Sequence, residues 1–366
     1  MRVILAAGVT ETGLIDGISA AGASPALLGH TPSADAEILV YGQPTAAPVT
    51  PVSPTGCPTP AAITRAVREV LGFDVTVLDA GLAEPTAAPT VDLEADPGTD
   101  IRERIAVPDA TDLYERAYAF GQDLPDERVL IGETIPGGTT TALGVMRALG
   151  EPLEVSSSLP ENPLERKRAV VSEGLTASGL APGDCAGSPL EAIRAMGDPV
   201  QAAVAGVAAG ALERGGRVTL AGGTQLVAVA AAIRHAGIDC PLELATTSFV
   251  TADPAVDLES ASENLDLIVT VTDPEFERSG HVSMARYCAG EAKEGVAMGG
   301  ALSLVPAGEM ATVRGRIETV CTRLGIEDER ERSGSSLESE TETTAATVDD
   351  ARSRANSNHP EDHASR

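Results

Sequence analysis

Short, strongly apolar segments alternate with longer helical segments along most of this chain. The runs VLIG at residues 129–132 and LIVTV at 267–271 are apolar at nearly every position. A strand with one solvated face alternates apolar and polar residues, so such runs indicate strands covered on both faces, as in parallel sheets. The predicted strands are residues 2–6, 37–41, 74–79, 128–132, 217–221, 243–246 and 267–271.

Helical segments fall between these strands. Regular alternation of strand and helix favours a parallel sheet with helices on both faces, because each connection must cross over the sheet. The sequence therefore predicts an α/β fold, with a three-layer Rossmann-like parallel sheet flanked by helices. The predicted helices are residues 60–71, 139–149, 163–174, 199–213 and 224–235.

Two segments depart from this alternation. Residues 43–60 are rich in Pro, Thr and Gly and are predicted to form an extended loop. Residues 326–366 carry 11 acidic residues and 5 arginines but almost no large apolar side chains. Such a composition cannot bury a core, so we expect a disordered acidic tail there and a folded domain over residues 1–325.

The charge balance excludes some classes of function. The chain has 54 acidic and 26 basic residues, a net charge of −28, and Lys167 and Lys293 are its only lysines. Nucleic-acid binding requires a basic surface and often aromatic platforms, and aromatic residues make up only 2% of the chain. We therefore expect no nucleic-acid or membrane partner; the apolar stretches are also shorter than the roughly 18 residues of a spanning helix.

The scarcity of lysine favours a halophilic protein over an ordinary acidic protein with an acidic tail. In molar salt the Debye length is about 3 Å, so dense surface carboxylates stop repelling one another. The N-terminal sequence MRVILAAGVTETG shows no signal-peptide pattern, and the five cysteines form no CxxC pair. These features predict a cytoplasmic location with reduced thiols. The scattered histidines suggest no metal site, and no cofactor is expected.

A turn rich in Gly and Thr follows the strand predicted at 128–132 and opens a helix. Backbone N–H groups at a helix N-terminus bind anions, so the turn is a candidate phosphate site. It differs from a P-loop because Gly138 stands where the essential lysine belongs. The alternative is a tight strand–helix turn with a Thr cap. The candidate ligands are Gly132, Glu133, Gly137, Gly138, Thr139 and Thr140.

Two further segments contain charged residues that could serve chemistry. Residues 286–300 place Glu291, Lys293 and Glu294 among glycines, where backbone can approach a ligand and a carboxylate can act as a base. Residues 160–174 contain Lys167, a compact point charge suited to a phosphate. The alternative for both segments is a solvated surface whose charges have no function.

One glycine pair has a structural interpretation. Gly206 and Gly210 lie four residues apart in an Ala-rich helix that begins with Asp198-Pro199. Asp at an N-cap followed by Pro is a typical helix start. The spacing of the glycines predicts close packing against another helix rather than contact with a ligand.

Several of these segments together resemble a known family. GETIPGGTTTALGVMRALG, VSSSLPENPLERKRAVV, GDPVQAAVAGVAAGA and YCAGEAKEGVAMGGALSL occur in this order. They are similar to the archaeal and cyanobacterial relatives of nicotinate-nucleotide–dimethylbenzimidazole phosphoribosyltransferase. GVTETGLIDGISAAGASP and PTPAAITRAV near the N-terminus extend the resemblance, which covers roughly residues 1–325.

The resemblance implies a large domain with a parallel sheet, a small helical part built from both chain ends, and a homodimer. It also implies transfer of 5-phosphoribose from nicotinate mononucleotide to a benzimidazole, giving an α-ribazole phosphate for cobamide assembly. The family needs no metal, because its donor releases a neutral ring and only the acceptor must lose a proton.

Matching the family motifs assigns roles to particular residues. Glu294 corresponds to the catalytic base, Lys167 to the lysine at the phosphate end, and residues 132–140 to the phosphate loop. The sequence departs from the pattern because Gly138 or Thr139 replaces an Asn, and because EGVAMGG is longer than the usual Glu-Gly-Thr-Gly motif.

These departures leave alternatives open. Glu133 and Glu291 remain alternatives for the role of the base. The acceptor can be another benzimidazole or a purine. A non-catalytic nucleotide- or base-binding protein and a nucleotide hydrolase remain alternative functions on the same fold.

Overall fold

Seven strands form one parallel sheet in the computed structural model, which describes residues 1–19 and 25–326. The strand order is β3-β2-β1-β4-β5-β6-β7, and every neighbouring pair is parallel. The acidic tail predicted at 326–366 lies outside the described residues from 327 onward. The strands are β1 (Arg2–Ala7), β2 (Asp74–Asp79), β3 (Thr90–Asp92), β4 (Arg128–Thr134), β5 (Arg217–Ala221), β6 (Leu242–Thr247) and β7 (Leu267–Thr272).

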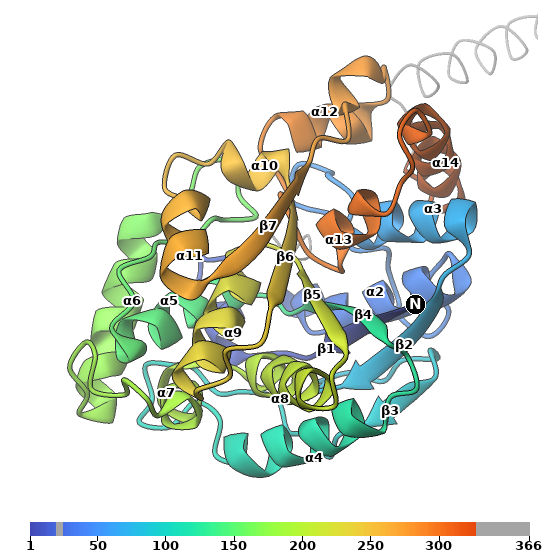
Figure 1. Ribbon diagram of the computed structural model, residues 1–366. Coiled ribbons are helices and arrows are strands. Elements are labelled where there is room, and N and C mark those ends of the chain that lie inside the picture. Colours follow the sequence, from blue (N-terminus) through green and yellow to red (C-terminus); the bar gives the residue numbers. More distant parts are fainter. Residues whose placement is uncertain (20–24, 327–366) are drawn as a thin grey trace, which may run out of the picture. The chain divides into compact units, whose positions relative to one another are not determined.

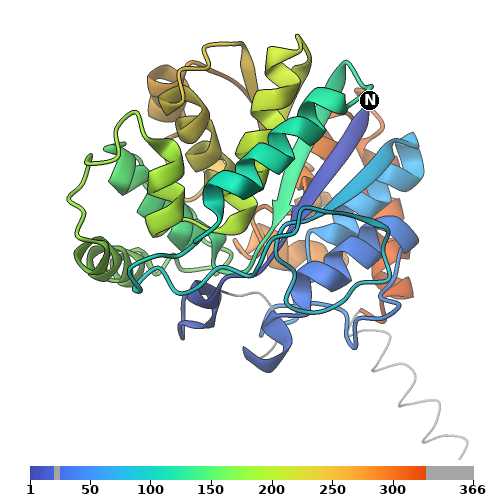
Figure 2. The ribbon, with the colours of Figure 1, turned by 90° about the horizontal axis from the view of Figure 1, so that it is seen from below.

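Helices cover both faces of the sheet (Figure 1; Figure 2). In the described part of the chain these are α1 (Pro25–Leu28), α2 (Thr31–Tyr41), α3 (Ala61–Leu71), α4 (Ala110–Asp123), α5 (Gly138–Leu149), α6 (Leu164–Ser178), α7 (Pro189–Met196), α8 (Pro199–Glu213), α9 (Thr224–His235), α10 (Ser248–Thr251), α11 (Leu258–Leu265), α12 (Val282–Cys288), α13 (Met298–Ser303) and α14 (Met310–Arg323), with 3-10 turns at Glu11–Leu14 and Phe276–Arg278. No helix among these residues is both long and apolar enough to cross a membrane.

The two faces of the sheet belong to different hydrophobic clusters because successive strand side chains point to opposite sides. In β1, Ile4 and Ala6 pack with α4, α8 and α9, whereas Val3 and Leu5 pack with α2, α3 and α13. Helices α3 and α14, from opposite ends of the described chain, lie side by side over the second face (Figure 1). The three-layer α/β fold predicted from the sequence is thereby confirmed.

One predicted strand is wrong. Residues 37–41 (EILVY) belong to helix α2, whose residues Thr31 to Leu39 are all buried. A helix buried on every side has no polar face, so its sequence reads like a buried strand. The burial of Glu37 is compensated because its carboxylate accepts hydrogen bonds from the backbone N–H groups of Ala46 and Ala87.

The order of the strands reverses between β1 and β4. From β1 the chain proceeds outward to β2 and β3, then returns to add β4 on the other side of β1. The connections on either side of this point diverge, which leaves a crevice at the carboxyl ends of the two strands. Ala7 pairs with Thr134 at this edge, so the residues that follow Thr134 surround the crevice.

The glycine pair on α8 serves the packing predicted from the sequence. A β-carbon at Gly206 would collide with the carbonyl oxygen of Tyr114 on α4, and one at Gly210 with that of Tyr118. Helices α4 and α8 therefore approach more closely than side chains at these positions would allow.

We expect Gly210→Ala to destabilise the protein by roughly 1–3 kcal/mol, because the added methyl group forces α4 and α8 apart. Thermal unfolding measures the effect. Gly315→Ala on α14 is the matched control, since a β-carbon there has no neighbour within 4 Å. The control should be neutral or up to about 1 kcal/mol more stable, as Ala favours helix. Equal melting temperatures for the two variants would contradict the close packing of α4 on α8.

Candidate functional site

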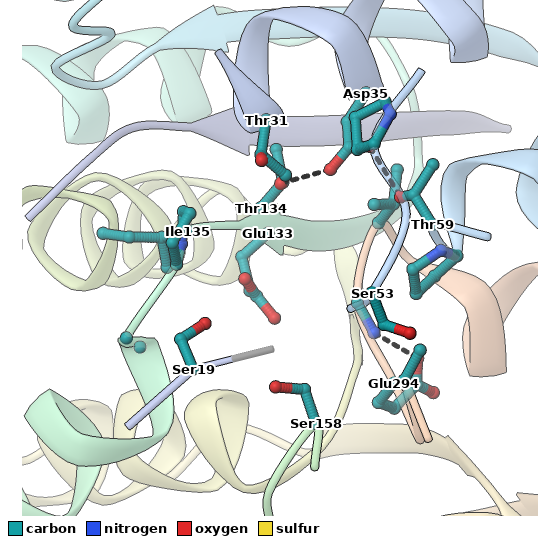
Figure 3. A pocket seen from close by; sticks show the side chains of 18 of the residues that line it. Ser19, Thr31, Asp35, Ser53, Thr59, Glu133, Thr134, Ile135, Ser158 and Glu294 are labelled. Atoms are coloured by element: carbon teal, nitrogen blue, oxygen red, sulfur yellow. Dashed lines mark hydrogen bonds between the residues drawn. The ribbon is translucent and has the colours of Figure 1, made fainter. Parts of the chain in front are cut away.

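A cavity opens at the carboxyl ends of the strands, beside the point where the strand order reverses (Figure 3). The space between its walls, including the part that is open to solvent, is about 760 Å³. Three groups of residues enclose it: the end of β4 with the turn into α5, the loop before α3, and the loop before α13. The polar side chains that line it are Ser19, Thr31, Asp35, Ser53, Thr59, Glu133, Thr134, Thr139, Ser158 and Glu294.

The N-terminus of α5 forms one wall. Gly137 is the N-cap, with φ 88°, and it joins β4 to α5 in a tight turn. Gly137, Gly138 and Thr139 all line the cavity. The N–H groups of Gly138 and Thr140 donate to the carbonyls of Ile135 and Gly137. The N-terminus of a helix still carries partial positive charge, so this wall favours an anion.

The loop before α13 forms the opposite wall and has a strained backbone. Ala292, Val296 and Ala297 have φ values of 45°, 51° and 61°, in the left-handed region that costs non-glycine residues free energy. Two hydrogen bonds hold the loop in place. The N–H of Val296 donates to the Glu133 carbonyl at 2.7 Å, and the Thr64 hydroxyl donates to the Val296 carbonyl at 2.7 Å.

Glu294 extends from this loop into the cavity and is half-buried. Its two carboxylate oxygens accept hydrogen bonds from the N–H groups of Gly295 and Gly299, each at 2.8 Å. Removal from water raises the pKa of Glu294 to about 8, although these two hydrogen bonds oppose the increase. The group can therefore exchange a proton near neutral pH.

Glu133 is a second carboxyl group in the cavity, at the end of β4 (Figure 3). It is 9% exposed. Burial, together with the charges of Asp198 and Asp35, raises the pKa of Glu133 to about 8. The charge of Glu133 in turn raises the pKa of Glu294. The two carboxyls therefore resist being ionised together unless a cation lies near them.

Both lysines of the chain hydrogen-bond to the segment from Ser156 to Leu159. Lys167 donates to the Thr139 hydroxyl at 2.9 Å and to the Ser156 carbonyl at 2.6 Å. Lys293 donates to the carbonyls of Ser157 and Leu159, each at 2.8 Å. The segment between these carbonyls carries Ser158, which lines the cavity. The two lysines therefore fix the position of this segment.

Burial changes the charge of this lysine pair. Lys167 is fully buried. Burial, together with the positive charge of Lys293, lowers the pKa of Lys167 to about 7, although the charge of Asp253 opposes the decrease. Asp253 lies 3.7 Å from Lys293 Nζ. An anion bound beside Thr139 would favour the charged form of Lys167.

The candidate residues divide into two groups in the structure. Glu133, Gly137, Gly138, Thr139 and Glu294 line the cavity together. The other candidates lie behind its walls: Gly132, Thr140, Lys167, Glu291 and Lys293. These residues support the cavity without lining it.

Gly132 and Glu291 have identifiable packing roles. A β-carbon at Gly132 would overlap Ala297, so glycine lets the loop that carries Glu294 pass over β4. The carboxylate of Glu291 accepts hydrogen bonds from the hydroxyls of Ser53 and Thr55. It thereby anchors the loop before α3, in which Ser53 lines the cavity.

Sequence reasoning missed the acidic side chain on α2. Asp35 lines the cavity, is 2% exposed, and accepts hydrogen bonds from the hydroxyls of Thr59 at 2.6 Å and Thr134 at 2.7 Å. Burial raises the pKa of Asp35 to about 7. The available signal was an Asp in the segment TPSADAE, which leads directly into the apolar run ILVY.

Comparison with known proteins finds relatives in several archaea. A UPF0284 protein from Halobacterium salinarum is 59% identical over 323 residues, covering 87% of this chain and 97% of that protein. UPF0284 proteins from Methanothermobacter thermautotrophicus and Pyrococcus furiosus are 40% and 41% identical, covering 92% and 90% of their own lengths. The halophilic character expected from composition fits the first relative. No family model matches the chain.

Two solved structures share the fold. The crystal structure of nicotinate-nucleotide–dimethylbenzimidazole phosphoribosyltransferase from Thermus thermophilus superposes with a TM-score of 0.56 at 18% identity, covering 89% of this chain and 85% of that chain. The structure of CobT from the same organism gives a TM-score of 0.57 at 19% identity, covering 89% and 86%. At this identity the likeness concerns the fold.

The raised pKa of Glu133 has a consequence for stability. Between the unfolded pKa near 4.5 and the folded pKa of about 8, the folded protein holds a proton that the unfolded chain has released. The stabilising contribution of this proton is complete below about pH 4.5 and is lost as the pH rises through about 8. Glutamine cannot ionise, so we expect Glu133→Gln to raise the melting temperature progressively more as the pH goes from 5 to 8.

Thermal unfolding of the ligand-free protein across this pH range measures that difference. Glu103→Gln, at an exposed position, serves as the control and should show no such trend. A melting-temperature difference for Glu133→Gln that stays constant from pH 5 to 8 would show that Glu133 ionises normally.

Proposed function

The chain belongs to the UPF0284 family, and we propose that it transfers 5-phosphoribose from nicotinate mononucleotide to a benzimidazole-type base. The product is an α-ribazole phosphate, a precursor for cobamide assembly. The observation that carries this proposal is one cavity lined by Glu294, Glu133 and the N-terminal turn of α5. The fold shared with the phosphoribosyltransferase from Thermus thermophilus supports it.

The two walls suit the two ends of the donor. The N-terminus of α5 and the Thr139 hydroxyl offer hydrogen bonds to the 5′-phosphate, and Lys167 orients that hydroxyl. The nicotinate ring then lies toward the carboxyls. Its ring nitrogen is positively charged in the mononucleotide, so the donor favours the ionised forms of Glu133 and Glu294.

The transfer breaks one bond and forms one. The bond between C1′ and the pyridinium nitrogen breaks, and its electron pair returns to the ring nitrogen, so that nicotinate leaves with an uncharged ring. A ring nitrogen of the acceptor bonds to C1′ from the opposite side, which inverts the configuration from β to α. The acceptor loses its N–H proton to Glu294, the general base. The fixed positions of donor and acceptor supply much of the rate.

The oligomeric state and the cofactor requirement are proposed from the resemblance to the phosphoribosyltransferase family. We propose that the protein acts as a homodimer and needs neither metal nor organic cofactor. Within the described residues, no group of three or more His, Cys, Asp and Glu side chains is arranged to hold a metal ion.

The decisive test is an assay for the product. The full-length protein in molar KCl is given nicotinate mononucleotide with 5,6-dimethylbenzimidazole, with adenine or without acceptor, and the products are identified by mass. We expect an α-ribazole-type phosphate that depends on the acceptor. Ribose 5-phosphate released equally without acceptor would identify a hydrolase instead, and binding without any product would identify a binding protein.

Glu294→Gln tests the assignment of the base. We expect the kcat to fall by about 10²- to 10⁴-fold, the typical contribution of a general base, whereas the affinity for nicotinate mononucleotide is retained. Glu103→Gln is the control for an exposed carboxyl and should leave the kcat unchanged. Undiminished product from Glu294→Gln would move the role to another group.

The pH dependence of kcat/KM offers a separate test of the pair of carboxyls. Because a base must be ionised and the pKa of Glu294 is about 8 in the free protein, kcat/KM should rise with pH and level off above about 8. Glu133→Gln removes a neighbouring charge that raises this pKa, so the midpoint should move to lower pH. A midpoint that is unchanged in Glu133→Gln would contradict the coupling.

Lys167 should affect binding of the donor more than the chemical step. Lys167→Met keeps the buried volume but removes the hydrogen bond to Thr139 and the charge. We expect the KM for nicotinate mononucleotide to rise about tenfold or more, with a smaller change in the kcat. Arg104→Ala, at an exposed position, is the control. Equal small effects from both variants would mean that Lys167 has no role at the phosphate end.

A further inference from the structure

The corner of the cavity beside α2 combines apolar walls with two polar side chains. Pro51, Val52, Pro58 and Pro60 give it apolar walls. It also contains the carboxyl of Asp35 and the hydroxyl of Thr31 (Figure 3). Such a corner suits the flat face of an aromatic ring with a polar edge, because apolar walls contact the face and a few polar groups fix the orientation.

Asp35 still has capacity for hydrogen bonds. One of its oxygens accepts from the Thr59 hydroxyl and the other from the Thr134 hydroxyl. A carboxylate oxygen has two lone pairs, so each can accept a further donor from a ligand in the cavity. The two threonines also fix the carboxyl in place, which reduces the entropy lost when a ligand binds.

Thr31 supplies an independent observation. It lines the same cavity, is 6% exposed, and its hydroxyl has no hydrogen-bond partner among the residues that the structure describes. A buried hydroxyl without a partner costs roughly 1–3 kcal/mol, so native proteins usually satisfy it. A ligand with a polar group beside Asp35 would do so.

The orientation of the donor and the acceptor in the cavity determines which edge of the acceptor ring reaches this corner. In the proposed reaction the phosphate of the donor binds at the α5 wall, and the N–H of the acceptor, which gives its proton to Glu294, must lie beside that carboxyl. The loop before α3 lines the cavity near both Asp35 and Glu294 (Figure 3). An acceptor ring stacked on this loop has its edge remote from the reacting nitrogen directed toward α2.

We propose that Asp35 and Thr31 select an acceptor base with a hydrogen-bond donor on the six-membered ring, in preference to a purely apolar ring. A ring hydroxyl or an exocyclic amine donates to Asp35 and satisfies the Thr31 hydroxyl. The inference rests on the proposed function, since it concerns the acceptor of the transfer. It deepens that function by naming the chemical class of the base.

The experiment compares acceptors of matched size. The full-length protein in molar KCl receives nicotinate mononucleotide with 5-hydroxybenzimidazole, 5-methylbenzimidazole or adenine, and kcat/KM is measured for each product. We expect 5-hydroxybenzimidazole to exceed 5-methylbenzimidazole by about 10- to 100-fold, the value of a hydrogen bond to a charged group. Adenine carries an exocyclic amine in place of the hydroxyl, so its kcat/KM shows whether the site also recognises an amine on a purine.

Two variants connect this preference to the residues. Asp35→Ala should reduce the hydroxyl-to-methyl ratio toward one, mainly through loss of activity with the hydroxylated base. Thr31→Val removes only the hydroxyl at nearly constant volume and should lower the ratio several-fold. Thr319→Val is the matched control, since that hydroxyl bonds to a carbonyl of its own helix, α14. A purely structural role would lower both activities equally and leave the ratio unchanged.

The outcomes separate the two proposals. A wild-type preference for the methyl compound, or an unchanged ratio in both Asp35→Ala and Thr31→Val, overturns the inference about the acceptor. Absence of product with every acceptor overturns the transferase. In that case calorimetric titration with the hydroxyl and methyl compounds decides the inference alone: tighter binding of the hydroxyl compound, lost in Thr31→Val, supports it, and equal binding overturns it.

Discussion

A single backbone hydrogen bond, from the N–H of Val296 to the carbonyl of Glu133, joins the two segments on which the site depends. It fixes the loop that carries Glu294 to the end of β4, which carries Glu133. The close approach requires glycine at position 132, because any β-carbon there would overlap Ala297. The strained φ values around Glu294 are therefore maintained by packing against the sheet.

This arrangement concentrates carboxyl groups where the protein excludes water. Asp35, Glu133 and Glu294 all line one cavity, and burial raises the pKa of each. A core selected for stability alone would not contain them, since each opposes folding once it ionises. Their cost is consistent with a site that receives a positively charged ring and must then remove a proton near neutral pH.

Local signals in the sequence account for most of the sheet and for part of the site. Six of the predicted strands and the five predicted helices exist because apolar runs, caps and glycines act over short distances. The strand predicted at residues 37–41 is wrong because a fully buried helix lacks the polar face that identifies a helix. Motif matching named Glu294 and Lys167, whereas Asp35 acquires its surroundings only when Thr59 and Thr134 fold against it. No short-range pattern encodes that contact.

The charge distribution bears on how an acidic chain could bind the anionic donor of the proposed reaction. A net charge of −28 repels a mononucleotide, and in molar salt exposed charges are screened within about 3 Å. Screening is far weaker for buried groups. Both lysines are buried, and both bind the segment from Ser156 to Leu159. The two lysines are thus placed where salt screens them little, so an acidic, salt-adapted surface is compatible with the phosphate site of the proposed function.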